Sequence, residues 1–144
     1  MKGKFKPKNP EKYKGDPTSI IWRSRWELKV MSNLDLSEEV EKWSSEEIII
    51  PYVDPVSGKR RRYFPDFWVR YKNGKQELIE IKPKYQVNQP EVKKKATKKY
   101  VRDVLTWGNN QAKWTAAEAW CKKNNHDWKI LTEDELFSDR RKNK

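Results

Sequence analysis

The stretch from residue 60 to residue 82 reads RRRYFPDFWVRYKNGKQELIEIK, and it decides the fold. Its two runs at 61–71 and 76–82 are rich in aromatic and β-branched residues, which is typical of β-strands. The Lys-Asn-Gly-Lys segment between them predicts a tight turn that joins the strands as an antiparallel hairpin. Upstream, EIIIPYV at 47–53 is a third such run, and DPVSGK at 54–59 is a second turn. The sequence therefore predicts an antiparallel meander of three strands.

The length of the turn at 72–75 decides which carboxylates share a face of this hairpin. A two-residue loop at 73–74 would pair Asp66 with Ile81, and the carboxylates of Asp66 and Glu80 would then point to opposite faces. A three-residue loop at 72–74, with its glycine in the left-handed conformation, instead pairs Asp66 with Glu80. The two alternatives therefore predict different chemistry.

The three-residue loop is favoured because it separates polar from apolar side chains. It places Asp66, Glu80 and Lys82 together on one face of the hairpin. The apolar residues of the two strands then share the other face, as a buried core requires: Phe67, Val69, Ile79 and Ile81. We therefore predict this turn, and with it two neighbouring carboxylates beside a lysine.

Two carboxylates on neighbouring strands repel each other unless a cation lies between them. Mg²⁺ or Mn²⁺ is the expected cofactor, because such ions prefer oxygen ligands and can activate the water that attacks a phosphodiester. Lys82 would orient that water or stabilise the negative charge on the phosphate. The alternative is a cluster of surface charges in which Lys82 only neutralises Glu80. The spacing acid-x-Lys does not decide between them, since it occurs four times in the sequence.

An amphipathic helix is expected ahead of the strands. Trp22, Trp26 and Val30 recur at four-residue spacing, which predicts a helix over 19–34. The segment SEEVEKW at 37–43 is interpreted as a short acidic turn.

Two further helices and one strand are expected after the meander. Segment 91–107 has helical spacing with a heavily basic opposite face, and Gly-Asn-Asn at 108–110 is expected to stop it and to cap a third helix over 111–125. DWKIL at 127–131 is a candidate last strand. This order predicts an α/β fold with a mixed sheet flanked by helices.

Composition limits the function classes. The 144 residues fit one domain, and 33 Lys and Arg against 21 Asp and Glu give a net charge of +12, which favours a polyanionic partner such as DNA. With one cysteine, Cys121, and one histidine, His126, neither a disulfide framework nor a zinc cluster is expected. No apolar stretch predicts a membrane span, so we expect a cytoplasmic protein. Residues 1–17 are expected to form a flexible basic arm, 18–137 the domain and 138–144 a basic tail.

Basic residues flank the expected metal site on both sides in the sequence, and we expect them to contact the DNA backbone rather than to read bases. The expected nucleic-acid-binding residues are Lys59, Arg60, Arg61, Arg62, Lys84, Lys93, Lys94, Lys95, Lys98 and Lys99. The alternative for each lysine is an ordinary solvated helix face. Trp68 is expected to form a wall of the site, and Lys84 and Gln86 to extend its cleft.

The motif residues resemble a known superfamily. FPDFWV at 64–69 followed by LIEIKPK at 78–84 resembles the Pro-Asp and Asp/Glu-x-Lys signature of restriction-endonuclease-like nucleases, and most closely the endonuclease subunit of cut-and-paste transposases. With IIWRSRWELKVM at 20–31 and KPKNPEKYKGDP at 6–17, nearly the whole chain resembles the head-completion nucleases of T-even-type phages. The resemblance implies a restriction-endonuclease-like core and metal-dependent cleavage of DNA.

The resemblance also implies a further acid on the first helix, and Glu27 occupies that place as a candidate metal ligand. The alternative is that Glu27 and Ser24 form a capping box for a helix that starts later than drawn above. Glu46 and Glu47 are the second choice for this ligand.

The predicted function is therefore a metal-dependent DNA endonuclease in which Asp66 and Glu80 hold the ion and Lys82 assists the attacking water. The resemblance implies a role in phage head completion on packaged DNA ends, with phage head or portal proteins as partners, in the host cytoplasm or in the virion. A non-catalytic basic DNA-binding or head-assembly protein and a structure-specific junction resolvase are the alternatives.

Overall fold

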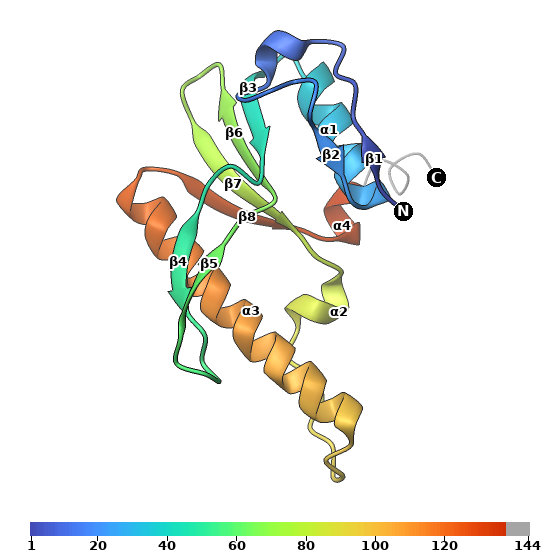
Figure 1. Ribbon diagram of the computed structural model, residues 1–144, viewed down its shortest axis with the longest axis vertical. Coiled ribbons are helices and arrows are strands. Elements are labelled where there is room, and N and C mark those ends of the chain that lie inside the picture. Colours follow the sequence, from blue (N-terminus) through green and yellow to red (C-terminus); the bar gives the residue numbers. More distant parts are fainter. Residues whose placement is uncertain (138–144) are drawn as a thin grey trace.

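The computed structural model describes residues 1–137, which form an α/β fold around a four-stranded mixed sheet (Figure 1). Three of its strands are antiparallel to their neighbours, and the fourth is parallel to the third. Helices lie against both faces of the sheet, so the predicted fold class is confirmed. In sheet order the strands are β3 (Val40–Ser45), β6 (Phe67–Tyr71), β7 (Gln76–Ile81) and β8 (Asp127–Leu131).

The turn between β6 and β7 is the predicted three-residue loop. The Tyr71 amide donates to the Lys75 carbonyl at 2.8 Å, and the Gly74 amide donates to the Tyr71 carbonyl at 2.9 Å. Gly74 has a φ of +88°, the left-handed conformation that glycine adopts without strain. Phe67 pairs with Ile79 in this register, and the next pair along the strands brings Asp66 opposite Glu80.

The first strand of the meander is not the predicted one. The acidic segment expected to be a turn forms the edge strand β3, in which Trp43 is fully buried and Val40 nearly so. The segment was not predicted as a strand because charged residues surround these two apolar ones and no alternation of polar and apolar residues is visible. The expected strands at 47–53 and 61–71 instead supply a separate two-stranded hairpin, β4 (Ile50–Val53) and β5 (Arg60–Tyr63). Pro65 separates β5 from β6 because proline has no amide hydrogen to donate to a ladder.

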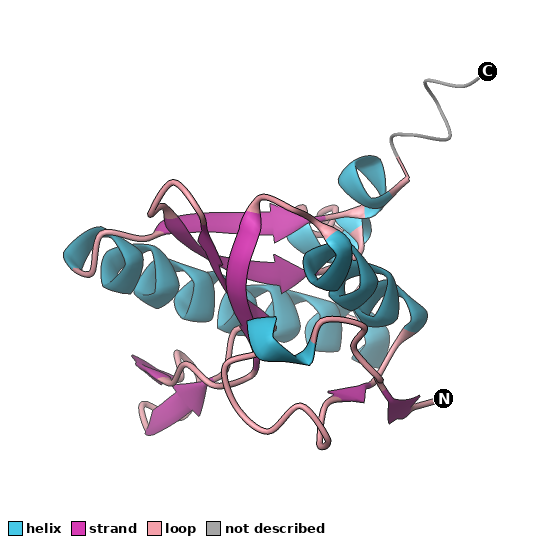
Figure 2. Ribbon diagram, turned by 90° about the horizontal axis from the view of Figure 1, so that it is seen from above, coloured by secondary structure: helices cyan, strands magenta, loops and turns pink. Residues whose placement is uncertain are grey.

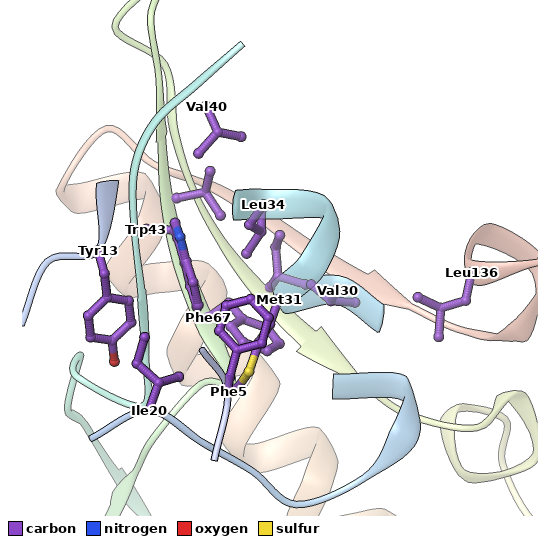
Figure 3. Packing of buried hydrophobic residues seen from close by; sticks show 12 residues of the cluster. Phe5, Tyr13, Ile20, Val30, Met31, Leu34, Val40, Trp43, Phe67 and Leu136 are labelled. Atoms are coloured by element: carbon purple, nitrogen blue, oxygen red, sulfur yellow. The ribbon is translucent and has the colours of Figure 1, made fainter. Parts of the chain in front are cut away.

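Helix α1 (Arg25–Leu36) begins later than the predicted helix at 19–34, because Ser24 caps it. The residues before it form β2 (Ile21–Trp22), which pairs with β1 (Gly3–Lys4). The buried face of α1 packs on the sheet face that carries Phe67, as Figure 3 shows.

The first seventeen residues pack against the domain rather than forming the expected flexible arm. Phe5 and Tyr13 are buried, and their rings lie 5.9 Å and 4.7 Å from the Trp43 ring, centroid to centroid (Figure 3). A short 3-10 helix, η1 (Pro10–Lys12), precedes Tyr13. The flexible arm was predicted because the segment is rich in lysine, and its composition does not show that these two aromatic residues are buried. The predicted basic tail at 138–144 lies outside the described residues.

One long helix, α3 (Lys98–Lys123), replaces the two helices predicted on either side of residues 108–110. Gly108 lies inside it, since a glycine costs only about 1 kcal/mol in a helix interior. The C-terminal half covers the second face of the sheet, where Trp114 and Cys121 join Trp68 and Leu78 in one buried cluster. The N-terminal half projects beyond the sheet (Figure 1), and Figure 2 shows the long helix running alongside the strands.

Two short helices complete the fold: α2 (Lys84–Val87) follows β7, and α4 (Glu133–Leu136) follows β8. Strand β8 has the predicted bounds. Within residues 1–137, no helix combines the length and the apolar character needed to cross a membrane.

Candidate active site

Asp66 and Glu80 meet at one end of the central sheet, where β6 begins and β7 ends (Figure 1). Glu80 is buried, and Asp66 is mostly buried. Oδ2 of Asp66 accepts a hydrogen bond from the Ile81 amide at 2.8 Å, which fixes its carboxyl group against β7. Buried Oε1 of Glu80 has no hydrogen-bond partner among residues 1–137. A buried carboxylate oxygen without a partner is costly, and it is available to a ligand.

Burial and the neighbouring Glu80 both destabilise the charged form of Asp66. Burial raises the pKa of Asp66 well above its usual value, and the neighbouring Glu80 raises that pKa further. The hydrogen bond from Ile81 acts in the opposite direction but is the smaller effect. A bound cation would relieve both causes, since it replaces lost hydration and cancels the repulsion. An all-oxygen donor pair with one unpaired oxygen fits a hard divalent cation.

The backbone around Asp66 is held in an unusual conformation. The amide of Glu46 donates to the Asp66 carbonyl at 3.1 Å, and Glu46 has a φ of 53°. A left-handed non-glycine residue costs about 1–3 kcal/mol and persists where surrounding structure enforces it. Its carboxylate forms a 2.8 Å ion pair with Arg23. Glu46 therefore supports Asp66 through its backbone, while its side chain is engaged elsewhere.

Lys82 lies just past the end of β7 and is partly buried. Its amide donates to the Leu131 carbonyl at 3.1 Å, so the backbone of Lys82 is tied to the end of β8. The alternation of β-strand side chains places Lys82 on the same side as Glu80.

Glu27 occupies a capping position beside the carboxylate pair. Its amide donates to Ser24 Oγ at 3.1 Å, and its Oε1 accepts from the Arg23 amide at 3.3 Å. Burial raises the pKa of Glu27, and Glu27 in turn contributes to the raised pKa of Asp66. Across residues 1–137, however, no group of three or more His, Cys, Asp or Glu side chains is close enough to hold a metal ion. The structure thus places Glu27 within electrostatic reach of Asp66 but as a helix cap.

Sequence reasoning missed Lys113, which reaches the same side of the sheet from α3. Its Nζ lies 5.8 Å from the Tyr63 ring centroid and 6.0 Å from that of Tyr52. Burial lowers the pKa of Lys113, Lys82 lowers it further and Glu80 raises it, so both site residues lie within electrostatic reach. No local pattern assigns it to the site, although Lys113 is the only basic residue between Arg102 and Lys122.

Tyr63, whose ring lies against Lys113, also lines the site. Its hydroxyl is buried without a hydrogen-bond partner in the described part of the chain. Burial raises the pKa of the Tyr63 hydroxyl, and the nearby Glu80 and Asp66 carboxylates raise it further. The phenol therefore stays protonated and faces the acidic pair.

Trp68 shares the predicted face but is only 4% exposed. Its indole N–H donates to His126 Nε2 at 3.2 Å. The side chain therefore belongs to the core beneath the site and is closed to stacking with a base.

All the predicted DNA-binding residues except Lys84, which lies on α2, are on two projections from the end of the sheet that carries the acids (Figure 1). One projection is the β4–β5 hairpin, and the other is the loop at 88–97 with the start of α3. Four of the predicted residues already have acidic neighbours. These ion pairs are Arg61–Asp54 at 2.9 Å, Lys84–Asp134 at 3.0 Å, Lys93–Glu91 at 3.9 Å and Lys99–Asp103 at 3.6 Å.

An α/β sheet that presents a Pro-Asp carboxylate opposite a Glu-x-Lys motif defines the restriction-endonuclease-like nucleases. In agreement, residues 37–133 match the family model described as TnsA-like endonuclease N terminal, and the chain belongs to this family. The chain is also similar to the head completion nuclease of Enterobacteria phage T4. The two are 42% identical over 139 residues, which cover 93% of this chain and 92% of the phage protein. The predicted family resemblance is confirmed.

Proposed function

We propose that this protein is a metal-dependent DNA endonuclease that acts in phage head completion, where it trims or protects packaged DNA ends. The observation that carries the chemistry is the buried Asp66–Glu80 pair with an unpartnered oxygen beside Lys82. The 42% identity with a head completion nuclease supports the biological setting. The host cytoplasm or the virion is then the location, and phage head or portal proteins are the expected partners.

Asp66 and Glu80 would hold Mg²⁺ or Mn²⁺. When bound, this ion would polarise the phosphodiester and acidify the attacking water. The Ile81 amide keeps the Asp66 carboxyl turned toward β7, which orients it before substrate arrives. Lys82 would orient the water or stabilise the negative charge that grows on the phosphate.

Glu27 would contribute to the same ion, directly or through a bound water. Its capping contacts are long, at 3.3 Å to the Arg23 amide and 3.5 Å to Ser24 Oγ, so little is lost when its carboxylate turns away. Burial, and to a smaller extent the charge of Glu46, raises the pKa of Glu27, and a bound cation would oppose both effects.

The basic projections would bind the DNA backbone on both sides of the carboxylates. Their positive charge would attract duplex DNA without reading its sequence. Residues without an ion pair in the described chain are expected to contribute most, because no existing contact must be broken: Lys59, Arg60, Arg62, Lys94, Lys95 and Lys98.

Plasmid cleavage by the purified protein tests this proposal. Cleavage should require Mg²⁺ or Mn²⁺, stop on chelation and fall by at least about 100-fold in Asp66→Asn, Glu80→Gln and Lys82→Met. Lys75→Met, an exposed change in the β6–β7 turn, is the matched control and should cleave normally. Equal cleavage by all four variants would contradict the proposal. Preference for branched over linear substrates would identify a junction resolvase instead.

A further inference from the structure

Helix α3 brings a second ammonium group to the active site. The helix packs on the sheet face that carries Asp66 and Glu80, with Trp114 and Ala117 buried against β7 and the β4–β5 hairpin. Lys113 precedes Trp114 on this helix. Its Nζ lies over the Tyr63 ring at 5.8 Å and the Tyr52 ring at 6.0 Å, measured to the centroids. These two rings hold the Lys113 side chain on the side of α3 that faces Asp66 and Glu80.

The ammonium group of Lys113 is poorly compensated. Within residues 1–137 it forms no ion pair or hydrogen bond, and it lies against the faces of the two aromatic rings. Burial removes part of its hydration, Lys82 repels its charge and Glu80 attracts it. Two ammonium groups that repel across a partly buried space favour an anion between them. Because Lys113 has already lost hydration, binding an anion there costs less desolvation than at an exposed lysine.

We propose that Lys113 binds the scissile phosphodiester, and that Lys113 and Lys82 together clamp the phosphate next to the carboxylate pair. This inference rests on the proposed nuclease function and names a residue outside its Pro-Asp and Glu-x-Lys motifs. The clamp places the ammonium groups of both lysines next to the phosphate before cleavage begins. They then stabilise the negative charge that develops during cleavage without moving. The Tyr52 and Tyr63 rings would fix the position of one of them.

Three variants test the clamp. Lys113→Met keeps the length of the side chain and removes the charge, Lys113→Arg keeps the charge, and Lys122→Met removes an exposed charge from the same helix. Single-turnover cleavage of a linear duplex should fall by at least about 100-fold in Lys113→Met. It should recover to within about tenfold of wild type in Lys113→Arg and stay unchanged in Lys122→Met.

A second measurement separates phosphate binding from a structural role. Binding of the same duplex without divalent ions is measured over a series of salt concentrations. The slope of log affinity against log salt should be smaller by about 0.9 in Lys113→Met, because one phosphate contact is lost. Thermal unfolding of Lys113→Met should occur no earlier than in wild type, since a desolvated charge has been removed.

The outcomes distinguish this inference from the proposed function. If wild type cleaves but Lys113→Met stays within about threefold of its rate and keeps the same salt slope, the clamp is overturned while the nuclease stands. A loss of cleavage with an unchanged slope and no recovery in Lys113→Arg also overturns it. If wild type and Asp66→Asn are equally inactive, the nuclease proposal fails, and the salt slope still decides whether Lys113 binds phosphate.

Discussion

Asp35 is predicted to fasten the N-terminal segment to the rest of the domain. It is 2% exposed at the end of α1, and its two carboxylate oxygens accept hydrogen bonds from the Lys8 amide at 2.8 Å and the Asn9 amide at 3.0 Å. Asp35→Ala removes both acceptors and leaves two partly buried amides unpaired. A hydrogen bond to a charged group contributes about 1.5–3 kcal/mol, so we expect a loss of about 3–6 kcal/mol in the free energy of unfolding.

Urea denaturation measures this loss as a lower midpoint at an unchanged slope. Asp35→Asn keeps one acceptor oxygen and should lose about half as much. Asp103→Ala, at an exposed position on α3, is the control and should change the free energy by less than about 0.5 kcal/mol. Limited proteolysis should also cut the first seventeen residues sooner in Asp35→Ala. A loss below about 1 kcal/mol with unchanged proteolysis would refute the argument that this segment is part of the core.

Three further predictions concern the acidic pair and the turns. The pKa of Asp66 is raised in the folded protein, which therefore binds the Asp66 proton more tightly than the unfolded chain does. The contribution of Asp66 to stability consequently falls as the pH rises above about 4, the ordinary pKa of an aspartate. Asp66→Asn should therefore unfold at a higher temperature than wild type at pH 7.5 but not at pH 3.5, and a gain that is equal at both pH values would contradict this. Mg²⁺ at about 100 times its dissociation constant should stabilise wild type by about 2.7 kcal/mol and leave the double variant Asp66→Asn/Glu80→Gln unchanged, as calorimetry can check. Gly74→Ala should destabilise by about 1 kcal/mol because of its φ of +88°. Gly108→Ala should stabilise by a similar amount, because no side chain or other segment lies within 4 Å of the added carbon. Denaturation midpoints that move in the same direction would contradict this contrast.

The β6–β7 hairpin could be predicted because its determinants are local. Alternation along 67–71 and 76–81, together with one glycine in the turn, sufficed to place Asp66 opposite Glu80. The strand Asp127–Leu131 was equally clear from its apolar residues and the polar turn before it.

The remainder depended on contacts between distant segments. Trp43 makes β3 a strand by packing against Phe5 and Tyr13, which lie about thirty to forty residues earlier, and a local pattern shows none of this. Gly108 stays helical because tertiary packing of the residues after it outweighs its low propensity. Lys113 could not be assigned to the site, since only the packing of α3 on the sheet brings it near Glu80.

Because α3 is one continuous helix, the distance between its projecting part and the acidic site is fixed. Fourteen helical steps separate Lys99, on the projecting part, from Lys113, and at 1.5 Å per residue they span about 21 Å. This distance equals about six base-pair steps of B-form DNA at 3.4 Å each. A duplex bound along the projecting part of the helix would therefore reach the acidic pair at a fixed distance from the bound phosphates. The length of the helix would then set the position at which the strand is cut.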